Sequence, residues 1–516
     1  MPRPPAPVDQ VRDLELLLNA HHPVLYLEAE EAERAQALLE HVADRLDLLF
    51  LTWSPHRGLD HPLMPEPLED TADPARCLQH IASSRHEAIY YLRDFVRTFA
   101  DDATLTARLR ETHQALWQHR GAIVLTGPSA SELPEDVGPL VTTVAIAPPS
   151  DEEYHQFVSD VLRDLRTRRA VRVEMDGAGV AKLLQQLRGL TFFEVKKVVT
   201  QAIAERWTLD ASAIARALEA KKKVLRRTGV LEYSPAEHSL DDIAGLARLK
   251  RWLRKRRAVF DDPARAKEFG LSAPRGILLL GVPGCGKSLC AKAVAREYGL
   301  PLIRLDPSRL YTKYIGETEQ NLRRATRTAE AMAPIVLWID EIEKGLGSET
   351  GGSDGGVSTR VFGSFLSWLQ EKPDGVFVVA TSNDIAQLPP ELLRKGRFDE
   401  IFFVDLPGPT VRREIVRLHL ARRGRDPEAF DLQAVVDKTD GFSGAELEQC
   451  VVSALYAAYD EGAALATRHL LAELAVTRPL SVTSGEKITG LRAWATGRAV
   501  PADLPPEEAQ VPVGPT

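Results

Sequence analysis

The segment from Gly281 to Ser288 constrains the fold of this chain more than any other stretch. It reads G-V-P-G-C-G-K-S and lies between an apolar run over residues 276–280, which predicts a buried strand, and a helical pattern over residues 289–298. Glycines let a backbone wrap around phosphate oxygens, and the following helix N-terminus adds partial positive charge. The lysine of such a loop reaches the outer phosphates, and the serine hydroxyl contacts Mg²⁺. The stretch therefore predicts a nucleotide site on a parallel α/β sheet.

The residues expected to bind the nucleotide at this loop form one continuous run. They are Gly281, Val282, Pro283, Gly284, Cys285, Gly286, Lys287, Ser288 and Leu289, with Ser288 also expected to bind Mg²⁺. An ordinary glycine-rich turn is the alternative, but it would explain neither the preceding strand nor the following helix.

Composition limits the remaining possibilities. A chain of 516 residues with 44% apolar residues has room for several packed domains. Its four cysteines form no C-x-x-C pair, no apolar run approaches the ~18 residues of a membrane span, and no signal peptide is visible at the N-terminus. We therefore expect a soluble cytoplasmic protein without a membrane partner.

Hydrophobic periodicity divides the chain into two similar halves, each with alternating strands and helices followed by helices alone. The expected parts are a disordered segment over residues 1–10, a first domain over 11–228, a linker over 229–238, an α/β domain over 239–409, a helical lid over 410–488 and a tail over 489–516. Residues 189–199 match residues 441–451 in pattern, and residues 144–150 match 404–410. These matches predict an internal duplication, with chance similarity of two α/β domains as the alternative.

The first half lacks the residues of a nucleotide site. After its first predicted strand the chain reads Glu28-Ala-Glu-Glu-Ala-Glu33, with no glycine and no lysine where a phosphate loop would lie. Arg93-Asp94 follows the strand over residues 88–92, where a magnesium ligand would be expected. This half is therefore expected to have lost nucleotide binding, which leaves its surface for partner recognition.

Polar residues follow two more strand patterns of the second half, and two arginines lie on a later loop. Asp340 and Glu341 follow the apolar run over residues 335–339, where they could hold the water shell of Mg²⁺ and polarise an attacking water. Asn383 ends the next strand and could orient that water. Arg394 and Arg397 lie on a loop, and guanidinium groups suit the charge that develops on phosphoryl oxygens.

From about residue 240 to 473 these segments resemble an AAA domain of the P-loop ATPase superfamily. The resemblance implies ATP hydrolysis with Mg²⁺, with Asp340 and Glu341 at the metal and catalytic positions, Asn383 as sensor and the two arginines as fingers that act on a neighbouring subunit. A ring, most often a hexamer, follows from that implication. Further nucleotide contacts implied by the resemblance are Asp242 and Ala244 of the opening motif, His419, and Gly444 and Ala445 of the lid. Ala244 stands where the family usually has glycine, and Cys285 where threonine is common.

Two loops bear on what hydrolysis drives. Tyr314 and Ile315 stand where AAA unfoldases carry an aromatic pore loop that grips a polypeptide, although an aromatic residue there could simply pack under the sheet. The Gly- and Ser-rich residues 345–356 suit a second pore loop or a disordered segment. These loops favour remodelling of a protein partner.

Two other functions remain open. The whole chain resembles a bacterial and plastid AAA group known from a chloroplast reading frame, whose links to photosynthesis favour a slow nucleotide-controlled switch or scaffold. Basic clusters at residues 221–227 and 250–257 keep nucleic acid as a less favoured partner, since the net charge is −8 and such clusters usually solvate helix faces.

Overall fold

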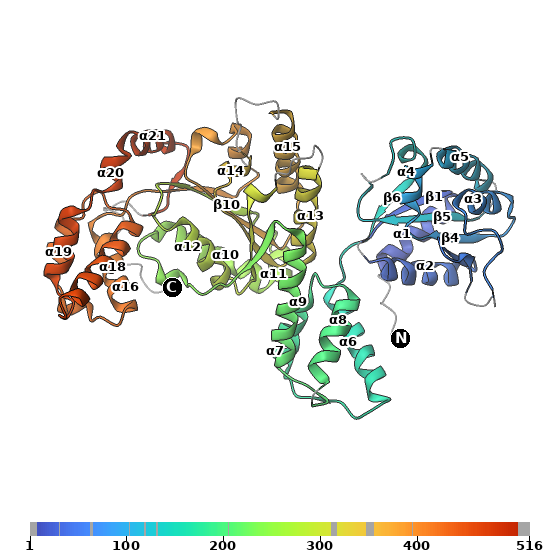
Figure 1. Cartoon of the computed structure of the whole chain (residues 1–516), viewed down its shortest axis with the longest axis horizontal. Coiled ribbons are helices and arrows are strands. Elements are labelled where there is room, and N and C mark those ends of the chain that lie inside the picture. The colour runs from blue at the N-terminus through green and yellow to red at the C-terminus, as the bar shows by residue number, and fades with distance from the viewer. Residues whose placement is uncertain are drawn as a thin grey trace. The chain divides into compact units, whose positions relative to one another are not determined.

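The computed structural model divides into two compact units, an N-terminal unit, Met1–Lys221, and a C-terminal unit, Lys222–Thr516 (Figure 1). It describes residues 8–29, 31–61, 66–102, 104–117, 120–130, 133–204, 206–310, 317–346, 355–394 and 396–503. Both units contain a mostly parallel sheet with helices on its faces, which confirms the predicted α/β class. None of the helices in the described ranges combines the length and the apolarity that a membrane span requires.

The N-terminal unit begins with a six-stranded sheet whose order is β3-β2-β4-β5-β1-β6. Its elements are α1 (Val8–Asn19), β1 (Val24–Glu28), α2 (Ala32–Leu46), β2 (Leu49–Ser54), β3 (Gly58–Asp60), α3 (Pro74–Ser83), β4 (Ala88–Leu92), α4 (Thr98–Asp101), α5 (Thr104–Leu116), β5 (Ala122–Gly127) and β6 (Thr142–Ala145). Helices α1 and α2 cover one face of the sheet, and α3 and α5 cover the other.

A helical part completes this unit. It consists of α6 (Asp151–Arg166), β7 (Arg172–Val173), α7 (Gly177–Leu187), α8 (Phe192–Ile203), β8 (Thr208–Leu209) and α9 (Ser212–Thr228), the last of which continues into the C-terminal unit. Strands β7 and β8 pair in a small parallel sheet that the sequence did not predict.

The C-terminal unit holds a seven-stranded sheet in the order β15-β14-β10-β13-β12-β11-β9. Its elements are β9 (Leu231–Ser234), α10 (Ala247–Asp261), α11 (Pro263–Glu268), β10 (Gly276–Gly281), α12 (Lys287–Glu297), β11 (Leu302–Leu305), α13 (Glu317–Ala331), β12 (Ile335–Ile339), α14 (Glu343–Leu346), α15 (Gly355–Glu371), β13 (Val376–Ser382) and β14 (Glu400–Val404). The lid and the chain end add α16 (Pro409–Arg422), α17 (Leu432–Asp437), α18 (Gly444–Asp460), α19 (Thr467–Val476), α20 (Leu480–Thr483), α21 (Gly485–Ala495) and β15 (Val500–Pro501).

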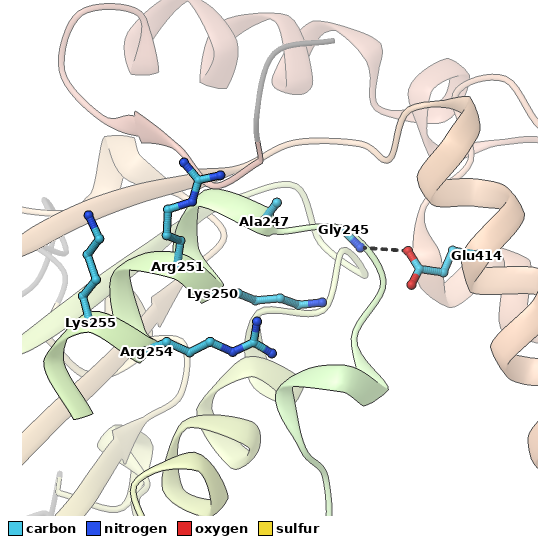
Figure 2. A pocket seen from close by; sticks show the side chains of 7 residues that line it. All are labelled: Gly245, Ala247, Lys250, Arg251, Arg254, Lys255 and Glu414. Carbon is cyan, nitrogen blue, oxygen red and sulfur yellow. Dashed lines mark hydrogen bonds between the residues drawn. The ribbon is translucent and has the colours of Figure 1, made fainter. Parts of the chain in front are cut away.

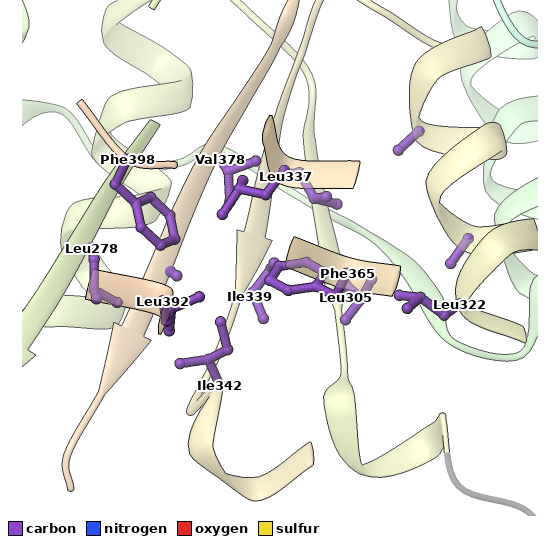
Figure 3. Close-up of a cluster of buried hydrophobic side chains, with 14 of the residues drawn as sticks. Leu278, Leu305, Leu322, Leu337, Ile339, Ile342, Phe365, Val378, Leu392 and Phe398 are labelled. Carbon is purple, nitrogen blue, oxygen red and sulfur yellow. The ribbon is translucent and has the colours of Figure 1, made fainter. Parts of the chain in front are cut away.

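The apolar strand β10 is buried on both faces because helices cover both sides of this sheet. Ile277 and Leu279 face α10 and α12, whereas Leu278 and Leu280 join the core against α13 and α15. Figure 3 shows Leu278 in this second core, near Leu392 and Phe398. Packing on both faces fixes the strand that leads into the phosphate loop.

The two units also share their strand order and the backbone conformation at two matching turns. Read in the same direction, β6-β1-β5-β4-β2 corresponds to β14-β10-β13-β12-β11, and all these neighbours are parallel. Asp94 after β4 and Glu341 after β12 both adopt a positive φ, 53° and 50°. Gly189 and Gly441, which precede α8 and α18, have φ values of 78° and 76°. The structure therefore supports an internal duplication.

The structure corrects three boundaries. The predicted linker over residues 229–238 contains β9, which pairs antiparallel with β11 and extends the sheet. The predicted tail over residues 489–516 includes most of α21 and all of β15, and β15 pairs with β14. Residues 8–10 of the segment predicted to be disordered begin α1. Strands β9 and β15 are too short to show periodicity, so only the neighbouring strands reveal them, whereas α21 carries Ile488, Leu491 and Ala495 at helical spacing, a signal that the sequence prediction missed.

Candidate functional site

The phosphate loop joins β10 to α12 with the backbone that glycine permits. Gly284 and Gly286 have φ values of 76° and 90°, a left-handed conformation that other residues rarely adopt. Lys287 is 6% exposed, and its Nζ donates to the carbonyl oxygens of Gly281 and Val282, both at 2.8 Å. Burial lowers the pKa of Lys287 to about 8. A phosphate beside this ammonium would restore its charged form, so the loop fits an anionic ligand.

Ser288 and Asp340 meet at the predicted magnesium position. The Ser288 hydroxyl donates to Asp340 Oδ1 at 3.1 Å, and Thr381 Oγ1 donates to the same oxygen at 2.9 Å. Arg304 lies 3.3 Å from Asp340 Oδ2. No group of three or more His, Cys, Asp or Glu side chains forms a metal cage in the described ranges. One carboxylate and one hydroxyl instead fit Mg²⁺, which usually keeps waters and phosphate oxygens in its shell.

Glu341 and Asn383 are brought together at the carboxyl ends of β12 and β13. Asn383 Nδ2 donates to Glu341 Oε1 at 2.8 Å, while the Glu341 amide donates to Thr381 Oγ1 at 3.0 Å. Lys344 forms an ion pair with the second carboxylate oxygen of Glu341 at 2.5 Å, which raises the pKa of the lysine. Both oxygens of the predicted base are therefore held by the chain.

Glu343 stabilises the position of Asn383 beside Glu341. It is 7% exposed, and its Oε1 accepts a hydrogen bond from the backbone N–H of Asn383 at 2.9 Å. Its Oε2 is buried without a hydrogen-bond partner in the described chain. The sequence prediction missed Glu343 together with Arg304, Thr381 and Lys344. A charged residue within the otherwise apolar strand β11 was the available signal for Arg304.

The two predicted arginine fingers differ in their surroundings. The Arg397 guanidinium donates to the carbonyl oxygen of Glu391, so it helps to fold its own loop. The Arg394 side chain is exposed and makes no hydrogen bond or ion pair with any described residue. Of the two, only Arg394 has a guanidinium group available for a site outside its own loop.

The opening segment, whose Asp242 and Ala244 are predicted nucleotide contacts, is bonded to the lid. Asp242 Oδ2 accepts the amide and hydroxyl of Ser239, and these bonds lower the pKa of Asp242 to about 2. Arg422 of α16 donates to the Asp242 carbonyl at 3.1 Å. His419, on the same helix, lies 3.5 Å from Glu448 of α18, and burial lowers its pKa. The opening segment, including Ala244, is thus connected to the first lid helix.

The lid also reaches the phosphate loop. The Ala445 amide, at the start of α18, donates to the Gly284 carbonyl at 2.9 Å. The thiol of Cys285 lies 3.8 Å from the Pro283 carbonyl, and burial raises its pKa to about 11. Gly444 and Ala445 therefore lie beside the loop, while their contact with a nucleotide stays a prediction. Tyr314 and Ile315 of the predicted pore loop lie outside the described residues, as does most of the second loop, residues 347–354.

The basic clusters are largely engaged within the chain. Lys221 is fully buried, contrary to its expected place on a solvated face, and it donates to the Gln185 carbonyl at 3.1 Å. On α10, Lys250 donates to the Ile243 carbonyl, and Arg254 forms an ion pair with Asp241 at 2.9 Å. Lys250 and Arg254 thus hold the opening segment, and the engagement of these cations within the chain weakens the hypothesis of a nucleic-acid partner.

Figure 2 shows the pocket of about 690 Å³ that the second cluster lines, beside the Gly245 turn. Arg251 and Lys255 line this pocket without a hydrogen bond or ion pair to a described residue, and Glu414 of α16 accepts the Gly245 amide at 3.4 Å. The pocket therefore borders the junction between the sheet domain and the lid.

Comparison with known proteins identifies the family. Residues 277–406 match the family model of ATPases associated with various cellular activities (AAA). The AAA domain-containing protein ycf46 of Trieres chinensis is 33% identical over 488 residues, which cover 94% of this chain and 96% of that protein. The chain belongs to the AAA ATPase family. The AAA domain-containing protein ycf46 of Pyropia yezoensis is 32% identical over 501 residues, or 96% of this chain and 99% of that protein.

Other parts of this AAA ATPase match separate models. Residues 10–146 and 152–228 match the N-terminal and second domains of SpoVK-like AAA ATPases, and residues 429–471 match an AAA+ lid domain. The proteasome-activating nucleotidase of Aeropyrum pernix is 38% identical over 210 residues, which are 40% of this chain and 51% of that protein. The matches confirm an AAA domain with its lid behind an AAA-like N-terminal half, and they support ATP hydrolysis as the activity.

Proposed function

We propose that this AAA ATPase hydrolyses ATP with Mg²⁺ and assembles into a ring, a hexamer by family resemblance, that remodels a protein partner. The contact between Asn383 and Glu341 carries the hydrolytic part of the proposal, since it places an amide donor on the predicted base at 2.8 Å. The similarity to a proteasome-activating nucleotidase supports a protein as the partner.

The residues present suit each role in hydrolysis. Lys287 would exchange the carbonyl oxygens of Gly281 and Val282 for phosphate oxygens. A bound Mg²⁺ would supply positive charge between the phosphates. Ser288 and Asp340 lie 3.1 Å apart, where their oxygens would hold that ion and its waters. Glu341 would polarise the attacking water, with Asn383 fixing the direction of the carboxylate.

The hydrolytic part is tested with Glu341→Gln, which keeps the shape of the side chain and removes its basicity. We expect this variant to bind ATP as the wild type does and to lose at least about 99% of phosphate release. Glu268→Gln is the matched control, because this exposed carboxylate on α11 lies away from the site. Undiminished phosphate release by Glu341→Gln would exclude Glu341 as the base.

The ring is tested through Arg394, whose guanidinium makes no hydrogen bond or ion pair with a described residue, which supports a role in a neighbouring subunit's site. We expect Arg394→Ala and Glu341→Gln each to be inactive alone and to regain part of the activity when mixed. In the mixture, an Arg394→Ala subunit keeps its own Glu341 and receives Arg394 from its neighbour. Normal hydrolysis by Arg394→Ala, or a mixture that stays inactive, would contradict the shared site; Arg425→Ala, another exposed arginine, is the control.

A slow switch or scaffold is the second candidate, and the Lys344 ion pair favours it. Glu341 must release Lys344 before its second oxygen can meet a water, which would slow basal hydrolysis. We expect Lys344→Ala to raise the basal turnover, measured as phosphate release without any partner. If unfolded protein stimulates the wild type far above the Lys344→Ala rate, remodelling is favoured. If the wild type is slow and unfolded protein does not stimulate it, the switch is favoured.

A further inference from the structure

In the N-terminal unit, side chains of the chain itself fill the position that corresponds to the phosphate loop. Strand β1 leads into α2 as β10 leads into α12, and Glu31 is the residue directly before α2. Glu31 Oε2 accepts the amide of Phe192, the first residue of α8, at 2.9 Å. A carboxylate therefore contacts the N-terminus of a helix from the helical part.

The corresponding helix of the C-terminal unit is α18. Both helices begin with the same capping box, Thr191 with Glu194 in α8 and Ser443 with Glu446 in α18. In α18 an amide of the first turn donates to the phosphate loop at Gly284, whereas in α8 such an amide donates to Glu31. The same helix end thus faces a ligand-binding loop in one unit and a fixed carboxylate in the other.

A second contact closes the N-terminal unit from the same turn of α2. Arg34 is 5% exposed and donates to Glu153 Oε1 at 3.0 Å and to the Ala147 carbonyl. Glu153 belongs to the first turn of α6, where its other oxygen accepts the Ser150 amide at 2.8 Å. Side-chain exposures of 6% and 12% make this a buried ion pair, so removal of either partner leaves the other charge without compensation.

We propose that Glu31 and Arg34 replace a ligand in the N-terminal unit: they hold α6 and α8 closed on the sheet permanently, so this unit does not open and close with nucleotide. Side chains at the start of α2 thus hold α6 and α8 in place without a bound ligand. The N-terminal unit then stays closed without a nucleotide cycle of its own.

Hydrogen exchange of the full chain, read by mass spectrometry, tests this proposal at α8 and α18 together. In the wild type we expect MgATP to slow exchange in the first turn of α18 and to leave the first turn of α8 unchanged. Slowed exchange in α8 on adding MgATP would overturn the proposal. This arm needs no variant of the N-terminal unit. If MgATP leaves exchange unchanged in α18 as well as in α8, the result refutes the nucleotide site and does not contradict the proposed closure.

Variants test the closing contacts directly. We expect Glu31→Ala to raise exchange in the first turn of α8 about tenfold or more, and Arg34→Ala to do the same in the first turn of α6. Glu31→Gln is the matched control, because its amide oxygen can still accept the Phe192 amide, and it should stay within about threefold of the wild type. Peptides of β4 and β5 show whether the sheet remains folded. Wild-type exchange in α8 of Glu31→Ala would refute the role of Glu31.

Discussion

The titration of Glu31 gives a prediction that the sequence alone could not. Burial raises the pKa of Glu31 from 4.5 to about 7, against the opposing effects of the Phe192 amide and Arg34. The folded N-terminal unit therefore holds a proton between these pH values that the unfolded chain has released. It follows that the free energy of unfolding falls as pH rises from 4.5 through 7, and that Glu31 adds almost no slope above about pH 8.

The magnitude follows from the two pKa values. Each pH unit between them costs about 1.4 kcal/mol, so Glu31 should make the unit about 2 kcal/mol less stable at pH 8 than at pH 5.5. Glu31→Gln removes the titration and keeps the shape of the side chain. The charged and titratable groups that act on Glu31, and that remain in the variant, are Arg34 and Glu33 on α2, Tyr154 on α6 and Glu194 on α8. Arg34 is itself paired with Glu153 on α6.

Pulse proteolysis in urea measures the difference on the full chain. Peptides from β1 and β5 report unfolding of the N-terminal unit separately from that of the C-terminal unit. We expect the pH-dependent loss of stability to be about 2 kcal/mol smaller in Glu31→Gln than in the wild type. Glu111→Gln, an exposed carboxylate on α5, should keep the wild-type slope. Parallel slopes for the wild type and Glu31→Gln would refute the reasoning.

Three further predictions concern other parts of the chain. Arg34→Met should destabilise the N-terminal unit by about 3–5 kcal/mol in the same assay, because Glu153 keeps a buried charge without its partner; a loss below about 1 kcal/mol would contradict this. A chain that ends at residue 484 should melt about 5 °C or more below one that ends at residue 503, since it lacks α21 and β15; equal melting temperatures would show that both elements are dispensable. Tyr314→Ala should keep basal ATP hydrolysis within about twofold and lose work on a protein partner, whereas a loss of about 3–5 kcal/mol in stability would identify Tyr314 as a core residue.

Much of this fold follows from local patterns. Strand β10 and the loop before Lys287 were predictable because a continuous apolar run, glycines and a helix follow one another in sequence. Asp340 and Asn383 were predictable for the same reason, since each follows an apolar strand. Short elements such as β9 and β15 were not, because two to four residues carry too little periodicity and depend on a neighbouring strand to form.

The supporting residues of the site were hidden for a different reason. Lys344 contacts Glu341 and Glu343 contacts Asn383, both from the segment that follows β12. Arg304 contacts Asp340 from the neighbouring strand β11. Such contacts depend on how strands pair, which a single sequence does not display. The segment around Glu31 was predicted to lack a phosphate loop, but the contact of Glu31 with the Phe192 amide, 161 residues away, could come only from the structure.

The last described residues of the chain complete the domain that begins near residue 239. Strand β15 lies beside β14, the Ala502 carbonyl accepts the Leu249 amide, and Asp503 accepts the Ala247 amide at the start of α10. During synthesis, residues 1–221 leave the ribosome with every partner of their own sheet, whereas the opening helix of the ATPase domain lacks its partners until residue 503 emerges. The order of translation thus allows the N-terminal unit to fold before the first helix of the ATPase domain has its partners at residues 502 and 503.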